Sequence, residues 1–252
     1  MTHFKTVFFA AGLFLVATPA HAQMSGFGDG EGFTVGLGVI ADWSPYKGAD
    51  APSTTPIPYI AYDWENAHLG VDGFSYNFFI TDTLQISALL EPRWSFGDPE
   101  DSPLFEDIER DTALEAGIEV AMDLGLFFVG GNILKDISDV HNGFEVSIET
   151  GLETEFGGAQ FSTLVGYAYR NKDLSAHLYG VRLDEARDGL DAYVPDTSWY
   201  PYISADAIYP IGDSMGILAF SKYEHLESGA TNSPLITEDR DVTFGIAFLK
   251  QF

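Results

Sequence analysis

A strict alternation of apolar and polar residues constrains this chain more than any other feature of its sequence. From Phe144 to Phe156 every second residue is apolar or threonine, and the residues between them are glutamate, serine or glycine. The same period of two runs through 33–43, 113–122 and 243–252. Because successive side chains of a strand point to opposite faces, each segment is predicted to be a β-strand with one apolar face and one small or acidic face.

The composition of the polar face distinguishes a membrane barrel from a soluble β-sandwich, which also alternates. The polar face of a sandwich meets bulk water and is usually rich in Lys, Thr and Glu, whereas here it is rich in Gly, Ala, Ser and carboxylates. Small residues suit a crowded, curved interior, and apolar residues facing lipid around a polar lumen are typical of transmembrane barrels. The sequence therefore predicts an all-β fold, a monomeric transmembrane up-and-down antiparallel β-barrel.

We expect about twelve strands, an even number as in bacterial single-chain barrels. The third and fourth could instead form one strand kinked at Asp72-Gly73. Short links are expected to be periplasmic turns and long links external loops, which places both chain ends in the periplasm. The expected strands are 33–43, 55–64, 66–71, 73–80, 83–94, 111–122, 124–134, 143–155, 159–170, 199–209, 214–225 and 240–252.

The first 22 residues are typical of a secretory signal peptide. Lys5 precedes an apolar run from Val7 to Ala17, and Ala20-His21-Ala22 provides a cleavage site before Gln23. A membrane-spanning helix is the alternative, but it needs about 20 apolar residues. We therefore expect a signal peptide over 1–22, a periplasmic N-terminal tail over 23–32 and a barrel over 33–252.

Aromatic residues and the last residue also favour the outer membrane. The chain ends on Phe252, which is typical of the signal recognised by the barrel assembly machinery, and Lys250 on the same apolar face can extend to the interface. Aromatic residues gather near the expected strand ends, where membrane barrels carry interfacial girdles. These residues are Trp43, Tyr46, Tyr59, Tyr62, Trp64, Trp94, Phe96, Tyr167, Tyr169, Trp199, Tyr200, Tyr202, Tyr209 and Tyr223. Outer-membrane lipid and lipopolysaccharide are the surroundings that this pattern predicts.

Composition excludes several classes of function. With 38 acidic and 12 basic residues the net charge is -26, which disfavours nucleic-acid binding. The absence of cysteine excludes disulfides, thiolate metal sites and cysteine nucleophiles. Two of the six histidines lie in the expected signal peptide, and the other four are isolated in sequence and lack metal-site spacing, so neither a metal nor a cofactor is expected.

His141 has the best context for catalysis, because Asp139 two residues earlier could orient it as a general base. The alternative, which we favour, is a loop residue that folds the connection 135–142 through hydrogen bonds. No nucleophile elbow or phosphate-binding loop is present in the sequence. We therefore expect a protein without enzymatic activity.

Inward-facing carboxylates form the most informative constellation. Few cations accompany them, namely Arg93, Arg170 and Lys222. The interior is therefore either held shut by ion pairs and trapped water, or a narrow pore that prefers cations, because rings of carboxylates select cations. The carboxylates expected in the lumen are Glu91, Glu115, Glu119, Glu145, Glu149, Glu153, Glu155 and Asp206.

A second set of acids lies in two expected loops, 98–109 and 184–196. Such runs are usually solvated faces. The alternative is weak binding of Ca²⁺ or Mg²⁺ beside anionic lipopolysaccharide, although neither run matches an EF-hand loop.

Several segments, in order along the chain, resemble the MltA-interacting protein (MipA/OmpV) family of outer-membrane proteins. Trp43–Gly48 and Pro56–Tyr59 resemble the S-P-x-Y-x-G and P-x-P elements, and 104–109 resembles L-G-D-I-D, with Phe105 in place of Gly. Residues 136–143 resemble D-V-S-G-G-H-x-G, with Asp139-Val140 in place of Gly-Gly. Tyr179-Gly180-Val181 and 189–195 resemble Y-F-G-V and G-L-x-A-Y-x-P.

This resemblance implies an outer-membrane barrel without accepted catalytic residues. It also implies a scaffold that brings a lytic transglycosylase together with a peptidoglycan synthase, or a role in envelope integrity. We rank this function first and the narrow cation-preferring pore second.

Overall fold

The computed structural model describes residues 31–49, 52–94 and 98–252. The expected signal peptide, most of the expected N-terminal tail and Phe96 lie outside the described residues. Among the residues that are described, no helix is long and apolar enough to cross a bilayer.

Twelve antiparallel strands form a closed barrel in which each strand pairs with its chain neighbours and β1 pairs with β12. This confirms the predicted fold class. β3 and β4 are separate strands joined at Val71-Asp72, so the alternative of one kinked strand is wrong. The strands are β1 Gly32–Trp43, β2 Ser53–Asp63, β3 Ala67–Gly70, β4 Gly73–Ile80, β5 Leu84–Arg93, β6 Ala113–Asp123, β7 Phe127–Asp136, β8 Phe144–Phe156, β9 Ala159–Arg170, β10 Ser198–Pro210, β11 Met215–His225 and β12 Arg240–Gln251.

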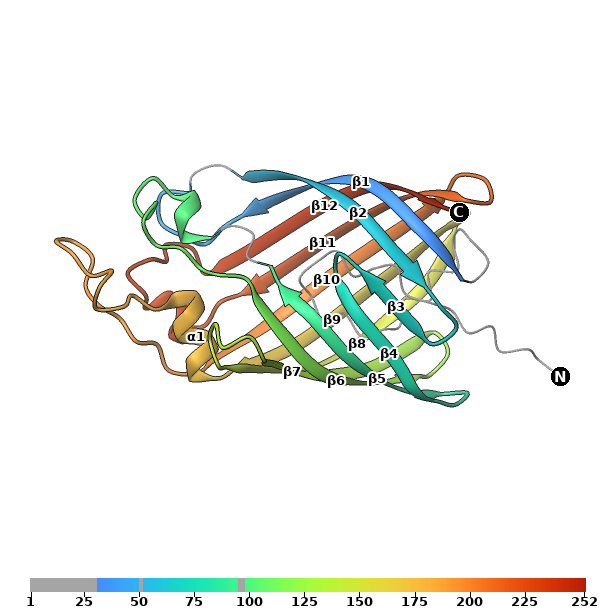
Figure 1. Cartoon of the computed structure of the whole chain (residues 1–252), viewed down its shortest axis with the longest axis horizontal. Helices are drawn as coiled ribbons and strands as arrows, with labels where there is room; N and C mark the ends of the chain where they lie inside the picture. Colours follow the sequence, from blue (N-terminus) through green and yellow to red (C-terminus); the bar gives the residue numbers. More distant parts are fainter. Residues whose placement is uncertain (1–30, 50–51, 95–97) are drawn as a thin grey trace.

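The two ends of the barrel differ in character (Figure 1). The start of β1 and the C-terminal Phe252 lie at the end with the short turns, where Phe252 N donates to Phe33 O at 2.9 Å. We call this the turn end. The long connections, with the helices α1 (Lys172–Tyr179) and α2 (Ser228–Thr231) and the 3-10 turn Pro99–Asp101, lie at the opposite loop end.

The outward faces of the strands are rich in apolar residues, as a membrane barrel requires. On β8, Val146 and Ile148 are exposed while Glu145 and Glu149 are buried. The same alternation holds on β1, where Leu37 is exposed and Thr34 is buried. Lys250 lies on the outward face, with its ammonium group 4.5 Å from the centre of the Phe252 ring.

Part of the interior is apolar, which corrects the expectation of a polar lumen. A core formed by β1, β2, β11 and β12 fills one side of the barrel, because large apolar residues occupy inward positions there. Its members are Ile40, Ile57, Tyr59, Ala61, Leu218, Phe220, Ala247 and Leu249. Tyr46, Tyr59, Tyr200 and Tyr202 are buried, so their assignment to an interfacial girdle is wrong, whereas Trp43, Trp64, Trp94 and Trp199 are exposed.

Inward glycines make room for large side chains of the neighbouring strand. A Cβ atom at Gly245 would overlap the ring of Phe220, and a Cβ atom at Gly166 would overlap the ring of Tyr202. Because β12 and β9 carry no side chain at these positions, the rings can lie flat across the wall. The small residues predicted for a crowded, curved interior therefore have a direct packing role.

The barrel wall is incomplete toward the loop end, because the hairpin β3–β4 is short. β2 pairs with β3 only over Ala61–Asp63, and β4 pairs with β5 only as far as Phe74 and Leu90. Figure 1 shows β2 continuing toward the loop end beyond this hairpin. Beyond the hairpin, Ser53–Pro58 of β2 and Pro92-Arg93 of β5 face one another with no strand between them. We call this stretch the wall break.

Prolines lie on both edges of the wall break. Ile60 O accepts from Val71 N at 3.1 Å, so even-numbered residues of β2 direct their backbone groups toward β3, and Pro56 and Pro58 follow on that edge. Leu84 O likewise accepts from Thr81 N, so even-numbered residues of β5 direct their backbone groups toward β4. Pro92 therefore lies on the edge of β5 that faces the wall break. Proline has no N–H to donate, so it belongs on edges that no other strand pairs with.

We predict that Gly245→Ala destabilises the barrel by about 1–3 kcal/mol, because the new methyl group overpacks against Phe220. Urea unfolding in lipid vesicles measures the free energy of unfolding. The double variant Gly245→Ala, Phe220→Leu should lose less than the sum of the two single losses. Additive losses would show that the Phe220 ring and the absence of a side chain at Gly245 are not energetically coupled.

Candidate functional site: a buried charge girdle beneath a loop cap

Six inward side chains of alternating charge cross the barrel near its loop end. We call them the charge girdle. In spatial order they are Glu115, Arg93, Glu145, Arg170, Glu224 and Lys222, from β6, β5, β8, β9 and β11. Three carboxylates and three cations balance, so the girdle carries no net formal charge. All six side chains are at most 12% exposed.

Short ion pairs connect the girdle across strands. Arg93 Nη2 lies 2.8 Å from Glu115 Oε2, and Arg93 Nη1 lies 3.6 Å from Glu145 Oε2. Arg170 Nε lies 2.9 Å from Glu145 Oε2, and Arg170 Nη2 lies 3.2 Å from Glu224 Oε2. Lys222 Nζ contacts the other oxygen of Glu224. Buried charges are tolerated only when they are paired in this way.

Arg170 lies at the centre of the charge girdle. Its guanidinium stacks over the ring of Tyr200, 3.8 Å from the ring centre, and Nη1 donates to the hydroxyl of Tyr179 at 2.6 Å. The Tyr200 hydroxyl donates to Glu145 at 2.7 Å. Only arginine offers a planar fork that can bridge two carboxylates and stack on an aromatic ring at once. Tyr179 belongs to α1, so Arg170 also connects the girdle to the loop end.

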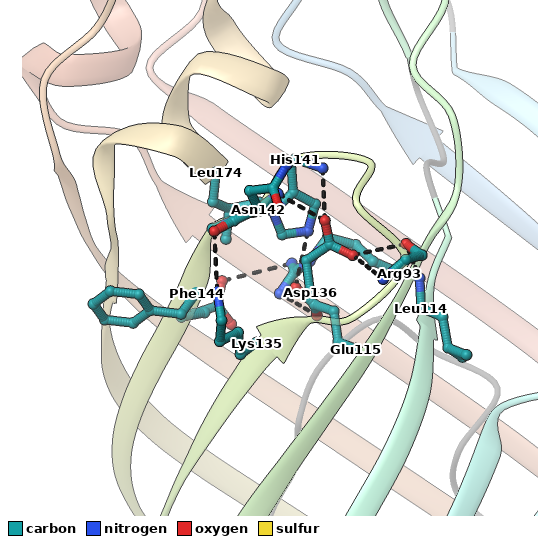
Figure 2. Close-up of polar contacts among 12 residues, drawn as sticks. Arg93, Leu114, Glu115, Lys135, Asp136, His141, Asn142, Phe144 and Leu174 are labelled. Atoms are coloured by element: carbon teal, nitrogen blue, oxygen red, sulfur yellow. Dashed lines mark hydrogen bonds and ion pairs between the residues drawn. The ribbon is translucent and has the colours of Figure 1, made fainter.

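The loop between β7 and β8 anchors the girdle from above (Figure 2). The Asp136 carboxylate accepts from the backbone N–H groups of His141 and Asn142, each at 2.7 Å, and from Ser138 N at 2.7 Å. His141 Nδ1 accepts from Gly143 N at 3.0 Å, and His141 Nε2 lies 3.2 Å from Glu115 Oε1. His141 therefore contacts Glu115, and not Asp139 as the sequence suggested.

Asp139 takes the place of a glycine in the related motif and adopts a left-handed conformation, with φ 62°. Aspartate tolerates this region better than most residues, because its short polar side chain can bond the local backbone. An aspartate at this position is therefore compatible with the left-handed turn in the loop that holds His141.

The histidines are less isolated in space than in sequence, which corrects our expectation. The rings of His141 and His177 lie 5.4 Å apart, between the β7–β8 loop and α1. His68 on β3 lies between two carboxylates, with Nδ1 2.7 Å from Asp63 and Nε2 2.9 Å from Asp72. Among the described residues no group of three His, Asp or Glu is arranged to hold a metal ion.

The long loops pack together into a cap over the girdle. The loop cap comprises 44–49, 98–112, 171–197 and 226–239. Arg110 and Glu185 form a buried ion pair of 2.7 Å between two of these loops, and Arg110 also donates to Gly180 O at 2.8 Å. The apolar core of the cap consists of Tyr46, Phe105, Ile108, Tyr179, Val181, Leu190, Leu226, Ala230, Leu235 and Ile236.

The cavity between the girdle and the cap is small. It has a volume of about 100 Å³ and is lined by girdle residues together with Asp42, Tyr46, Tyr179 and Asp241, among others. Pockets for small organic molecules usually measure about 300–1,000 Å³. This cavity has room for several water molecules, and its polar lining suits them.

The remaining carboxylates named from the sequence occupy several environments. Glu119 and Glu149 are buried, and Glu149 accepts from Tyr202 Oη at 2.6 Å. Glu91, Glu153 and Asp206 are partly exposed, and Glu155 is exposed near the β8–β9 turn. Of the loop acids, Glu185 and Asp107 are paired with Arg110 and Arg187.

One girdle residue and one three-residue cluster were missed from the sequence. Glu224 lies two residues after Lys222 on the same face of β11, a spacing that could have revealed it. The contact of His68 with Asp63 follows from the β2–β3 register, in which the two residues are partners, and its contact with Asp72 follows from the tight link between β3 and β4.

Removing the carboxylate shared by both arginines is expected to be costly. We predict that Glu145→Gln lowers the free energy of unfolding by about 3–5 kcal/mol, since it leaves Arg93 and Arg170 with one partner fewer in a buried site. The matched control Glu238→Gln, in a pair with Arg240 that is about half exposed, should cost less than about 1 kcal/mol. Equal losses in urea unfolding would contradict a stabilising role for the girdle.

A pH-dependent stability of the cap is expected from His177. Burial lowers the pKa of His177 to about 4, and the neighbouring His141 and Arg110 act in the same direction. As the pH falls from about 6.5 to about 4, the unfolded chain binds a proton that the folded cap does not, so the cap loses up to about 3 kcal/mol of stability.

Hydrogen exchange of the α1 amides between pH 7 and pH 4, corrected for intrinsic exchange rates, measures this loss. His177→Gln should abolish the pH dependence, whereas Lys172→Gln, at the exposed start of the same helix, should keep it. A pH dependence that survives in His177→Gln would assign the effect to another group.

The chain is similar to several known proteins. The MltA-interacting protein of Escherichia coli (strain K12) is 27% identical over 220 residues, which cover 85% of this chain and 88% of that protein. Outer membrane protein Omp26La of Vibrio anguillarum is 22% identical over 178 residues, 69% of each chain. A solved bacterial polysaccharide outer membrane secretin has 11% identity and a TM-score of 0.46, and the match covers 87% of this chain and 98% of that chain.

The family model described as MltA-interacting protein MipA matches residues 35–252, nearly the whole described chain. This match agrees with the closed antiparallel barrel and its outward apolar face. The chain therefore belongs to the MltA-interacting protein MipA family of outer-membrane β-barrel proteins.

Proposed function

We propose that this protein is a non-conducting outer-membrane anchor that holds murein-active enzymes, a lytic transglycosylase and a peptidoglycan synthase, at the periplasmic side of the membrane. A role in envelope integrity follows from such an anchor. The observation that carries the proposal is the filled interior, in which a neutral charge girdle, an apolar core and a packed loop cap succeed one another. A barrel built in this way is suited to hold partners rather than to pass solutes.

The proposed orientation places the turn end in the periplasm and the loop cap outside the cell. Short turns at one end and long loops at the other are typical of outer-membrane barrels. The periplasmic surface then consists of the turns and the segment before β1. A stable interface usually buries about 800 Å² on each partner. We therefore expect partners to use the N-terminal segment and the barrel rim together.

A narrow cation-preferring pore is the second candidate. The turn-end half of the interior carries Glu119, Glu149 and Asp206, and the amide of the buried Asn132 has no hydrogen-bond partner within the described part of the chain. Such groups can hold water and cations. For conduction the girdle and the cap must also open.

An enzymatic role has less support. His141 contacts Glu115 and its other ring nitrogen accepts from Gly143 N, so it folds the loop as the alternative interpretation of the sequence proposed. Hydrolysis of lipid or peptide by the pure protein, abolished in His141→Ala, would overturn the proposal.

Two measurements test the anchor. In planar bilayers we expect no stable conductance steps, whereas cation-selective steps that weaken in Glu149→Gln would favour the pore. In binding assays with a purified lytic transglycosylase and peptidoglycan synthase, deletion of 23–30 should weaken binding. Arg187→Ala, which removes an ion pair of the cap, should leave binding unchanged. A barrel that neither conducts nor binds either enzyme contradicts both candidates.

A further inference from the structure

We propose that the outward face of β8, β9 and β10 near the loop end binds a phosphorylated glycolipid of the outer leaflet, the chemical class to which lipopolysaccharide belongs. The site combines a shelf of aromatic rings, two lysines at one edge of the shelf and an aliphatic wall below it. The inference rests on the proposed orientation, which places the loop end outside the cell, and not on the anchoring of enzymes.

The aromatic shelf consists of four outward side chains in successive ring contact on three neighbouring strands. The rings of Tyr167 and Trp199 stack, with centres 5.5 Å apart and planes at 23°, and the centres of Tyr169 and Trp199 lie 4.7 Å apart. Phe144 continues the shelf toward β7, with its ring centre 6.0 Å from that of Tyr169. Trp199 is 44% exposed and Tyr167 is 39% exposed. The shelf therefore presents aromatic surface that can pack against the C–H groups of a sugar ring.

Two lysines lie at the β7 edge of the aromatic shelf. Lys135 is the register partner of Phe144, and Lys172 follows Asn171, whose side-chain oxygen accepts from Phe144 N at 2.9 Å. Figure 2 shows the Phe144 ring pointing away from the girdle residues drawn there. Lys135 Nζ donates to Asn142 O at 3.2 Å, which leaves two further N–H groups to donate.

These lysines are not neutralised by the protein. Both are exposed, and neither forms an ion pair with a carboxylate of the described chain, whereas Arg182, Arg187 and Arg240 at the same end each form one. In a chain with 38 acidic and 12 basic residues, two unneutralised lysines beside one aromatic ring favour an anionic ligand such as a phosphate.

Two acids beside the aromatic shelf are held by other groups. Asp173 Oδ2 accepts from Asn171 Nδ2 at 3.3 Å, and Glu227 Oε1 accepts from the Tyr167 hydroxyl at 3.0 Å. Glu227 follows β11, so it lies at the opposite edge of the shelf from Lys135. We therefore expect the phosphate at the β7 edge and the sugar over the rings of β9 and β10.

The wall below the aromatic shelf is aliphatic. Ile148, Val165 and Ile203 point outward and are 62%, 51% and 44% exposed. Each lies farther from the loop end than the shelf residue of its own strand. Because tryptophan favours the interface between hydrocarbon and headgroups, this wall lies at the depth of the acyl chains. Phosphate, sugar and acyl chains of one lipid can thus be in contact with lysines, rings and aliphatic side chains, whereas a phospholipid has no sugar ring for the shelf.

Native mass spectrometry tests this proposal, because it counts the lipids that stay bound when the full mature protein is released from detergent micelles. The probes are rough-type lipopolysaccharide and phosphatidylglycerol, each added at rising mole fractions. The test variants are the double variant Lys135→Gln, Lys172→Gln and the single variant Trp199→Leu. The matched controls are the double variant Lys47→Gln, Lys250→Gln, which removes the same charge from the loop cap and the turn end, and Trp43→Leu, an exposed tryptophan at the loop end of β1.

We expect the double variant at Lys135 and Lys172 to need about ten-fold more lipopolysaccharide for half-saturation, because two charge-assisted contacts are lost. Trp199→Leu should raise the half-saturation point several-fold, and both controls should leave it unchanged. Half-saturation that is equal in all variants would overturn the site in favour of unspecific contact with the barrel wall. Phosphatidylglycerol bound as tightly as lipopolysaccharide would overturn the assignment to a glycolipid.

Heat-modifiable gel migration verifies that each variant barrel is folded. If Trp199→Leu does not fold, the double variant at the exposed Lys135 and Lys172 decides alone. The assay contains neither a transglycosylase nor a peptidoglycan synthase, so a failure of the lipid site and a failure of the anchoring role are separate results.

Discussion

The structure depends above all on the requirement that backbone hydrogen bonds be satisfied inside a membrane. Hydrocarbon offers no donors or acceptors, so a spanning sheet must close on itself. Here closure is achieved by β1 and β12, which pair from Thr34 with Gln251 to Trp43 with Val242. Once the sheet is closed, inward and outward positions are determined for every strand, and each alternating segment has only one orientation that keeps its apolar face in lipid.

Closure creates an interior that must then be filled, and the chain fills it in two ways. Where β1, β2, β11 and β12 meet, large apolar side chains pack over glycines. On the remaining wall, the acids and cations of the charge girdle alternate so that each of these six groups has an opposite neighbour. The second solution is stable only if no partner is missing, because an unpaired buried charge costs several kcal/mol. The girdle itself therefore adds no net charge to this acidic chain.

The sequence predicted the features that depend on the local residue pattern. It missed the contacts that depend on the stagger between strands and on the conformation of the loops. Strand positions and the identity of outward faces follow from alternation alone. Glu145 and Arg170 are direct register partners across the β8–β9 turn, so their pairing could be anticipated. The contact of Arg93 with Glu145 spans non-neighbouring strands and depends on the stagger of the barrel. The contact of His141 with Glu115 depends on a left-handed loop that no periodicity reports.

At the wall break, the prolines in the sequence and the short β3–β4 hairpin depend on one another. A proline within a strand argues against a central position in a sheet, and Pro56, Pro58 and Pro92 all lie within strands of a closed barrel. They are tolerated because the β3–β4 hairpin ends before it reaches them, so no ladder requires their missing N–H groups. Lengthening this hairpin toward the loop end would require replacement of all three. The prolines and the short hairpin are therefore two parts of one structural solution, and the P-x-P element seen in the sequence marks the place where the wall is left open.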